Sequence, residues 1–165
     1  MTAFETPRLI VRPFRAEDLD ALAVVASDPE VMRFVGDGQP LGRAAVAEWI
    51  GRSRQNVARF GYGTAAVVER EAGALIGWTG FARPPEGGEE VVYGLALAWQ
   101  GRGLGHELLA GLVGFAGRTL APVKLRALIY PDNAASAALL ARAGFTLADR
   151  AYEGEDTHLY EKEIA

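Results

Sequence analysis

Gln100-Gly101-Arg102-Gly103-Leu104-Gly105 joins an apolar run at Val91–Trp99 to the helically spaced Leu108, Leu109 and Leu112. This pattern predicts a strand, a tight turn and a helix. Glycine lets the backbone come close to a ligand, because no side chain blocks the approach. The amides at the start of the helix, together with the helix dipole, favour an anion at that point. The stretch therefore predicts a site that holds a phosphate or pyrophosphate.

The other patterns along the chain predict an α/β fold with a mixed, mostly antiparallel sheet of about seven strands flanked by helices. Strands are expected at Arg8–Phe14, Thr64–Glu69, Leu75–Ala82, Glu90–Leu97, Lys124–Ile129, Phe145–Arg150 and His158–Ile164. Helices are expected at Asp18–Ala26, from Asp28 onward, and at Ala44–Arg59, Gly103–Gly117 and Asn133–Ala143, with loops at Gly36–Leu41 and Arg83–Glu89. The strand, helix and strand at 90–97, 103–117 and 124–129 should form a central, right-handed parallel crossover.

Composition limits the classes of function. The 165 residues suit one domain spanning 1–165, since no repeat or linker divides them. Cysteine is absent and only two histidines occur, so neither a disulfide nor a metal site is expected. The net charge of −4 is opposite to the usual balance of a nucleic-acid binder. Met1–Pro7 has no long apolar run, so we expect neither a signal peptide nor a membrane partner, and a cytoplasmic location.

The ligand of the glycine turn can be narrowed by comparing three phosphate carriers. A nucleoside triphosphate site would carry Gly-Lys-Ser/Thr after the loop, and this chain has no such run. A dinucleotide site would carry G-x-G-x-x-G, but Leu108 stands where the third glycine should be. Coenzyme A needs the same helix start for its pyrophosphate without the triphosphate machinery. CoA is therefore the expected ligand, and an enzyme of other chemistry that binds a nucleotide is the weaker alternative.

A family resemblance supports this interpretation. Residues 100–105 resemble the Q/R-x-x-G-x-G/A signature of the GNAT superfamily of acyl-CoA-dependent N-acetyltransferases. Asn133-Ala134-Ala135-Ser136, Leu139 and Gly144-Phe145 are similar to its N-x-x-S…L…G-F segment. Glu5-Thr6-Pro7-Arg8-Leu9 and Ser27-Asp28-Pro29-Glu30-Val31-Met32 resemble the Rim-type branch, which acetylates N-termini of ribosomal proteins and also contains small-amine and antibiotic acetyltransferases. The resemblance covers nearly the whole chain.

The resemblance implies a GNAT fold with acetyl-CoA as co-substrate and no metal. Acetyl-CoA would lie where the strands near Leu95 and Arg126 splay apart, and Asn133 would contact the pantetheine or the departing sulfur. The backbone of Leu95, Ala96 and Leu97 would pair with the pantetheine arm, although the Rim-type branch often has proline at position 97. The pyrophosphate would be held by the amides of Gln100, Gly101, Arg102, Gly103, Leu104, Gly105 and His106. The Arg102 side chain either assists with phosphate charge or is simply solvated.

Direct attack by an amine requires a base, because an alkylammonium has a pKa near 10. Glu90 opens the strand that leads to the turn, and its position matches a glutamate common in the Rim-type branch. Its carboxylate would accept the proton directly or through a water. The alternative is an ordinary surface charge beside Glu89. Other candidate bases are His158, Glu155 and Asp156.

The proton donor for the leaving sulfur is less evident. Many GNAT enzymes have a tyrosine for this role at the position that Leu140 occupies here. Ser136, Tyr130, Tyr160 or water would replace it. Ser136 and Asn133 also have structural interpretations, as a helix-surface residue and a helix cap respectively.

The expected function is transfer of acetyl from acetyl-CoA to a primary amine, either a protein N-terminus or a small molecule. A non-catalytic CoA-binding regulatory module is the alternative from another class. The acceptor pocket is expected from Phe34–Trp49, Arg83–Glu89 and Ala151–Thr157. A homodimer is left open.

Overall fold

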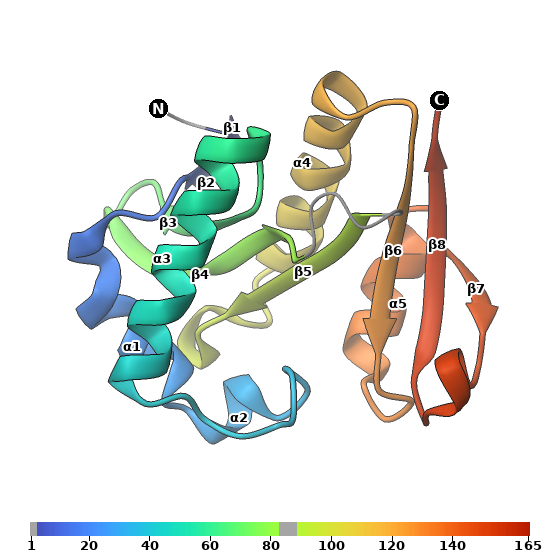
Figure 1. Ribbon diagram of the computed structural model, residues 1–165, viewed down its shortest axis with the longest axis horizontal. Coiled ribbons are helices and arrows are strands. Elements are labelled where there is room, and N and C mark those ends of the chain that lie inside the picture. Colours follow the sequence, from blue (N-terminus) through green and yellow to red (C-terminus); the bar gives the residue numbers. More distant parts are fainter. Residues whose placement is uncertain (1–2, 83–88) are drawn as a thin grey trace.

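The computed structural model describes residues 3–82 and 89–165. Figure 1 shows a single twisted sheet that runs through the molecule with helices on both faces. The elements are β1 (Phe4–Glu5), β2 (Leu9–Arg12), α1 (Leu19–Ala26), α2 (Pro29–Met32), α3 (Arg43–Phe60), β3 (Thr64–Glu69), β4 (Ala74–Phe81), β5 (Glu89–Leu95), α4 (Leu104–Thr119), β6 (Val123–Ile129), α5 (Ala134–Arg142), β7 (Thr146–Asp149) and β8 (His158–Ile164).

The sheet has eight strands in the order β1-β2-β3-β4-β5-β6-β8-β7. Each pair of neighbours is antiparallel except β5 and β6, which are parallel and joined through α4. The predicted mixed sheet and its central parallel crossover are therefore confirmed. The extra strand is β1, whose two residues are too few to show a period-2 pattern in the sequence.

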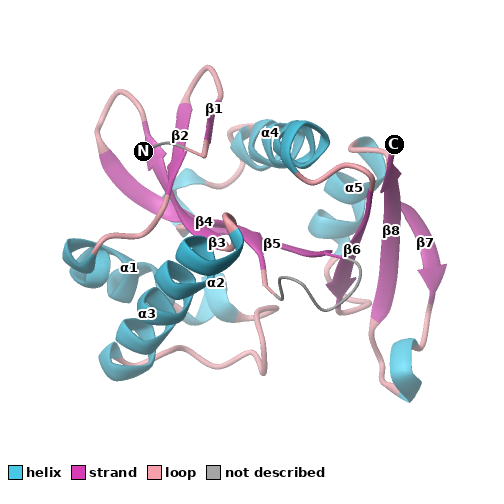
Figure 2. Cartoon of the chain, turned by 45° about the horizontal axis from the view of Figure 1, so that its top comes forward, coloured by secondary structure: helices cyan, strands magenta, loops and turns pink. Residues whose placement is uncertain are grey.

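Two apolar clusters hold the helices against the sheet. On one face, α1, α2 and α3 pack over β3 and β4 through residues such as Leu22, Ile50 and Trp78. On the other face, α4 and α5 pack over β4, β5 and β6 through residues such as Leu108, Leu112 and Leu140. Figure 2 shows α3 and α4 on opposite sides of the central strands. One face of β5 is therefore covered by α4 and α5, and the opposite face lies toward α1, α2 and α3.

Several local predictions are confirmed by the backbone. Asp28 caps α2, since its Oδ1 accepts from the Glu30 N–H at 2.9 Å. Of the predicted loop Arg83–Glu89, residues 83–88 lie outside the described residues, whereas Glu89 is buried and begins β5.

Within residues 3–82 and 89–165, no helix combines the length and the apolar character that a membrane span needs.

Candidate active site

The turn between β5 and α4 depends on two glycines with left-handed backbone. Gly101 has φ 75°, and Gly103, the residue directly before α4, has φ 78°. An L side chain costs about 1–2 kcal/mol in this region. No side chain caps Gly103, and the first N–H groups of a helix have no acceptor within it. The turn therefore presents amides and the positive end of a 16-residue helix, which suits an anion.

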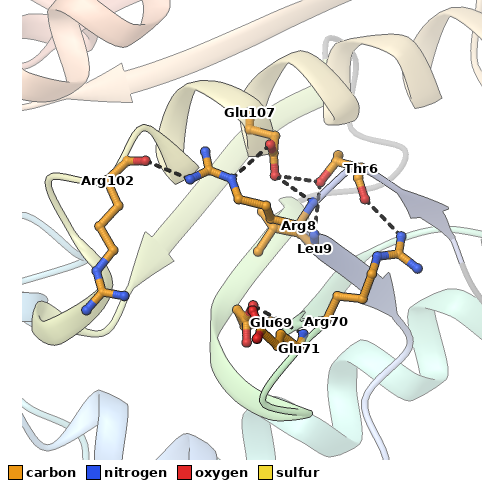
Figure 3. Close-up of polar contacts among 8 residues, drawn as sticks. All are labelled: Thr6, Arg8, Leu9, Glu69, Arg70, Glu71, Arg102 and Glu107. Carbon is orange, nitrogen blue, oxygen red and sulfur yellow. Dashed lines mark hydrogen bonds and ion pairs between the residues drawn. The ribbon is translucent and has the colours of Figure 1, made fainter.

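A network from the connection between β1 and β2 holds this turn in place (Figure 3). Arg8 Nε donates to Glu107 Oε1 at 3.2 Å, and Arg8 Nη1 donates to the carbonyl of Arg102 at 2.9 Å. Thr6 Oγ1 donates to Glu107 Oε2 at 2.9 Å. The sequence analysis missed Arg8 and Glu107, because they are 99 residues apart and no local pattern links them.

The side chain and the backbone of Arg102 contact different residues. It lies over the Trp99 ring, with Cζ 4.7 Å from the ring centroid. The side chain is therefore packed on the aromatic residue that precedes the turn, while its backbone is held by Arg8.

The third glycine of the signature serves helix packing. A Cβ on Gly105 would lie 3.2 Å from Leu139 Cδ1 on α5. The missing side chain at Gly105 thus lets α4 and α5 approach each other, a role that depends on a distant helix. The expected approach of a ligand to the backbone of Gly105 stays a prediction. His106 follows it, and its Nδ1 is buried without a hydrogen-bond partner among the described residues.

The two parallel strands separate soon after they meet. Their ladder consists of Glu89 with Leu125 and Glu90 with Arg126. Beyond these pairs β5 continues along β4 as far as Leu95, and β6 continues along β8 as far as Ile129. The inner edges of the two strands therefore diverge, as the resemblance implied for the region near Leu95 and Arg126.

The expected strand Glu90–Leu97 ends at Leu95, and Leu97 begins a short 3₁₀ turn to Trp99. The Ala96 N–H already donates to the Ile76 carbonyl at 2.7 Å, and the Leu95 carbonyl accepts from Gln100 Nε2 at 2.9 Å. The expected strand therefore ends two residues early, and the expected contacts of Ala96 and Leu97 with the pantetheine arm stay predictions. Since Ala96 bonds to β4, the backbone groups of Tyr93 and Leu95 point to the opposite edge, toward the divergence from β6.

Glu90 lies at the point where β5 and β6 begin to separate. It faces Arg126 in the parallel ladder, and its carbonyl accepts from the Ala82 N–H at 2.9 Å. Because side chains alternate along a strand, Glu90 shares a face with Val92, which packs against the α1–α3 cluster. The carboxylate therefore belongs to the face of the sheet opposite α4 and α5.

Asn133 and Ser136 lie in the first turn of α5. Asn133 is the cap residue, and its Oδ1 accepts from the Ser136 N–H at 3.2 Å. The capping interpretation of Asn133 is thus confirmed, and its amide NH₂ stays available for a further contact. Both residues are half-buried.

Tyr93 is a residue that the sequence analysis did not single out. Its hydroxyl oxygen is buried and makes no hydrogen bond within the described part of the chain. Burial raises the pKa of Tyr93, and the Ser136 side chain next to it lowers this pKa in part. The sequence feature that could have identified Tyr93 is its hydroxyl group, because its neighbours on the same strand face, Val91 and Leu95, are apolar.

The other candidate residues are further from the turn. The Tyr130 hydroxyl donates to the carbonyl of Gly36, and Tyr160 lies on β8 opposite Ala127. His158 is half-buried on β8 opposite Ile129, and Glu155 and Asp156 are exposed in the turn before β8.

A pocket opens on the Glu90 face. Its volume is about 170 Å³, and Ala82, which donates its N–H to the Glu90 carbonyl, lies in its wall. The wall consists of Trp49, Arg52, Ser53, Asn56, Thr64, Phe81 and Ala82. Within the described residues, the predicted acceptor segments contribute to this wall through Trp49 alone, while residues 83–88 lie outside the described residues. Trp49 is fixed by its Nε1, which donates to Thr64 Oγ1 at 3.1 Å.

Known proteins that resemble this chain in sequence and in fold are acetyltransferases. Residues 8–146 match the sequence profile of the acetyltransferase (GNAT) domain. An acetyltransferase from Agrobacterium tumefaciens shares 27% identity and has a TM-score of 0.81, over 96% of this chain and 92% of that chain.

Two structures of lower identity share the same fold. RimL, a ribosomal L7/L12 α-N-protein acetyltransferase solved in complex with coenzyme A, shares 19% identity with a TM-score of 0.80 over 96% of each chain. The ribosomal-protein-S5-alanine acetyltransferase from Vibrio fischeri shares 17% identity with a TM-score of 0.77, over 97% of this chain and 95% of that chain.

Proposed function

Because the chain belongs to the GNAT acetyltransferase family and is an acyl-CoA-dependent acetyltransferase, we propose that it transfers acetyl from acetyl-CoA to a primary amine by direct attack. One observation carries this proposal: the amide-lined turn before α4 stands at the end of β5, beside strands that diverge after Glu90 and Arg126. A ligand with a pyrophosphate at one end and a long arm at the other fits this arrangement.

The proposed contacts follow from the direction of the backbone groups. The amides of the turn, from Gln100 to His106, hold the pyrophosphate. The edge of β5 that faces away from β4 pairs with the amide groups of the pantetheine arm, as another strand would, through the backbone of Tyr93 and the Leu95 N–H. The Leu95 carbonyl already accepts from Gln100 Nε2. The NH₂ group of Asn133 contacts the same arm from α5.

The proposed chemistry uses the two faces of β5. The amine reaches the thioester from the Glu90 side, where the pocket beside Ala82 has space for its substituent. Glu90 accepts the proton of the ammonium, the neutral nitrogen forms the amide bond, and the carbon–sulfur bond breaks. The products are an acetylated amine and CoA.

The proposal also includes the class of amine that accepts the acetyl group. The names of RimL and the S5 acetyltransferase describe proteins that modify ribosomal proteins, which supports a protein or peptide N-terminus as acceptor. A small-molecule amine is the second class. The cytoplasmic location, the single domain over residues 1–165 and the absence of a metal or nucleic-acid partner stay predictions.

The test is release of free thiol from acetyl-CoA in the presence of a panel of amines. The panel contains peptides with free N-termini, the same peptides with blocked N-termini, polyamines, amino acids and aminoglycosides. We expect thiol release with one class of amine, together with a mass increase of one acetyl group on that amine. Tight binding of acetyl-CoA without thiol release from any amine would instead identify a non-catalytic CoA-binding module.

A further inference from the structure

Tyr93 is a buried polar group that the fold itself does not use. Its neighbours on the same strand face, Val91 and Leu95, belong to the apolar cluster under α4 and α5, and the Tyr93 ring packs against that cluster. Its hydroxyl oxygen is shielded from solvent and has no hydrogen-bond partner among the described residues. The Ser136 side chain is near enough to lower the pKa of Tyr93 in part, but it does not complete a hydrogen bond of normal geometry. The buried hydroxyl therefore keeps the capacity to bind a further partner in place of the water that it has lost.

The position of Tyr93 along β5 indicates which partner is missing. It lies between Leu95, at the turn that would hold the pyrophosphate, and Glu90, the proposed base. Tyr93 lies three positions after Glu90 along the strand, which is roughly 10 Å. The reacting end of the acyl donor must lie within this interval, because the base has to reach the attacking amine while the phosphates stay at the turn.

Tyr93 and Glu90 also lie on opposite faces of the strand. Tyr93 faces α5, where the Ser136 side chain is its polar neighbour, whereas Glu90 shares the face of Val92 toward α1–α3. The amine therefore arrives on one face, and the sulfur departs on the other. Leu140 cannot supply a donor on the α5 side, because its aliphatic side chain has no polar hydrogen and packs in the apolar core.

We propose that the Tyr93 hydroxyl donates a hydrogen bond to the thioester sulfur and then its proton to the departing thiolate. This role rests on the proposed function. As the nitrogen–carbon bond forms and the carbon–sulfur bond breaks, the sulfur takes the electron pair and the Tyr93 proton and leaves as the CoA thiol. The resulting phenolate recovers a proton from water. Ser136 positions the phenol from α5.

The chemistry of Tyr93 fits this role. Burial raises the pKa of Tyr93, so the phenol is protonated at neutral pH and has a proton to donate. The phenol carries a single proton on a rigid ring that is held by core packing, so its direction is fixed before the substrate arrives.

A first experiment requires no acceptor amine. The thiol pKa of CoA bound to the protein is measured from the ultraviolet absorbance of the thiolate, for the wild type, Tyr93→Phe and Tyr160→Phe. A hydrogen bond to a charged acceptor should lower the pKa of the bound thiol by about one to two units in the wild type. We expect this lowering to disappear in Tyr93→Phe and to persist in Tyr160→Phe, because β6 separates Tyr160 from β5.

A second experiment uses the acceptor found in the amine panel. Tyr93→Phe should lower kcat by roughly 100-fold at unchanged KM for acetyl-CoA, the lower end of the range for a proton-transfer group. The defect should nearly vanish with the selenoester of CoA, because a selenolate leaves without being protonated. A purely structural tyrosine would impair both donors equally.

The outcomes separate this proposal from the proposed function. If CoA does not bind, the proposed function and the proposed role of Tyr93 are both wrong. If CoA binds but its thiol pKa is the same in the wild type and Tyr93→Phe, the role of Tyr93 is wrong while the proposed function stands. If Tyr160→Phe instead abolishes the lowering, the donor is Tyr160. Unfolding of Tyr93→Phe would be seen by circular dichroism, and Tyr93→Trp, whose indole N–H also donates, would then be expected to retain part of the lowering.

Discussion

Two glutamates flank Arg126 in the sheet and offer a matched pair of substitutions. Glu90 faces Arg126 from β5, and Glu161 faces it from β8. Both carboxylates have the same cationic neighbour in the ladder, but only Glu90 lies beside the divergence of β5 and β6. Glu161 is paired with Lys124 at 3.4 Å.

We expect Glu90→Gln to lower kcat/KM by roughly 10²–10⁴-fold at neutral pH, the usual range for loss of a general base. Acetyl-CoA affinity, measured by calorimetry, should barely change, because the base does not contact the phosphates. The defect should shrink as the pH rises toward the pKa of the amine, since more acceptor then arrives neutral. Glu161→Gln should retain activity. Full activity of Glu90→Gln across the pH range would show that the proton leaves by another route.

Asn133 has two groups that can be tested separately. Its Oδ1 caps α5, whereas its NH₂ group is the proposed contact to acetyl-CoA. Asn133→Ala should cost about 1 kcal/mol of folding free energy, the usual loss for a helix cap. Asn133→Asp should keep the cap and hence the melting temperature, because aspartate is an equally good N-cap. Both variants should bind acetyl-CoA more weakly. If Asn133→Asp binds normally, the residue is a cap and nothing more.

Single residues were predictable where the chemistry is local, and missed where it is not. Asp28 was predicted as a cap, and a cap was one of the two interpretations of Asn133, because a cap depends on residues two or three positions away. The Arg8–Glu107 pair depends on the approach of β2 to α4, which no local spacing reveals. Tyr93 was hidden in a different way, because a tyrosine in an apolar strand is ordinary until its hydroxyl is seen to lack a partner.

At the scale of elements, the turn before α4 can be compared with another glycine turn in the same chain. Gly103 and Gly73 both have positive φ, of 78° and 67°. A Cβ at Gly73 would meet nothing within 4 Å, and one at Gly103 would meet the end of the Arg8 side chain at 3.5 Å. Alanine is therefore disfavoured at both positions mainly by backbone strain.

Gly73→Ala and Gly103→Ala should each lower the free energy of unfolding by about 1–2 kcal/mol. Gly103→Ala alone should also weaken acetyl-CoA binding, because it shifts the amides that begin α4. Denaturant unfolding and calorimetry on the two proteins measure the two effects separately. Equal and undiminished affinity in both variants would place the phosphates away from this turn.

The elements themselves were largely predictable, because glycine turns and apolar periodicity mark their ends. The errors lie where tertiary contacts decide. The strand β5 stops at Leu95 rather than Leu97, because the chain turns into a 3₁₀ segment at Leu97 and the Gln100 side chain donates to the Leu95 carbonyl. The packing of Gly105 against Leu139 was missed, because Leu139 lies on another helix.

At the scale of the whole molecule, the two parts of the sheet are joined by a parallel ladder of only two residue pairs within the described residues. The apolar cluster beneath α4 and α5 spans this junction on one face. A ligand that binds the turn before α4, the free edge of β5 and the start of α5 would connect both sides of the divergence. Its binding energy should therefore appear as stability of the whole fold.

At about 100 times its dissociation constant, acetyl-CoA should stabilise the protein by roughly 2.7 kcal/mol. For a chain of this size, this corresponds to a rise of about 5–10 °C in melting temperature. Adenosine 3′,5′-diphosphate at the same concentration should produce a much smaller rise, because it lacks both the second phosphate of the pyrophosphate and the arm that pairs with β5. Hydrogen exchange should show the largest added protection in β5 and in the first turn of α4. A protein shown to be folded and CoA-free that gains no stability from saturating acetyl-CoA would contradict the CoA site, and equal stabilisation by both ligands would contradict the pairing along β5.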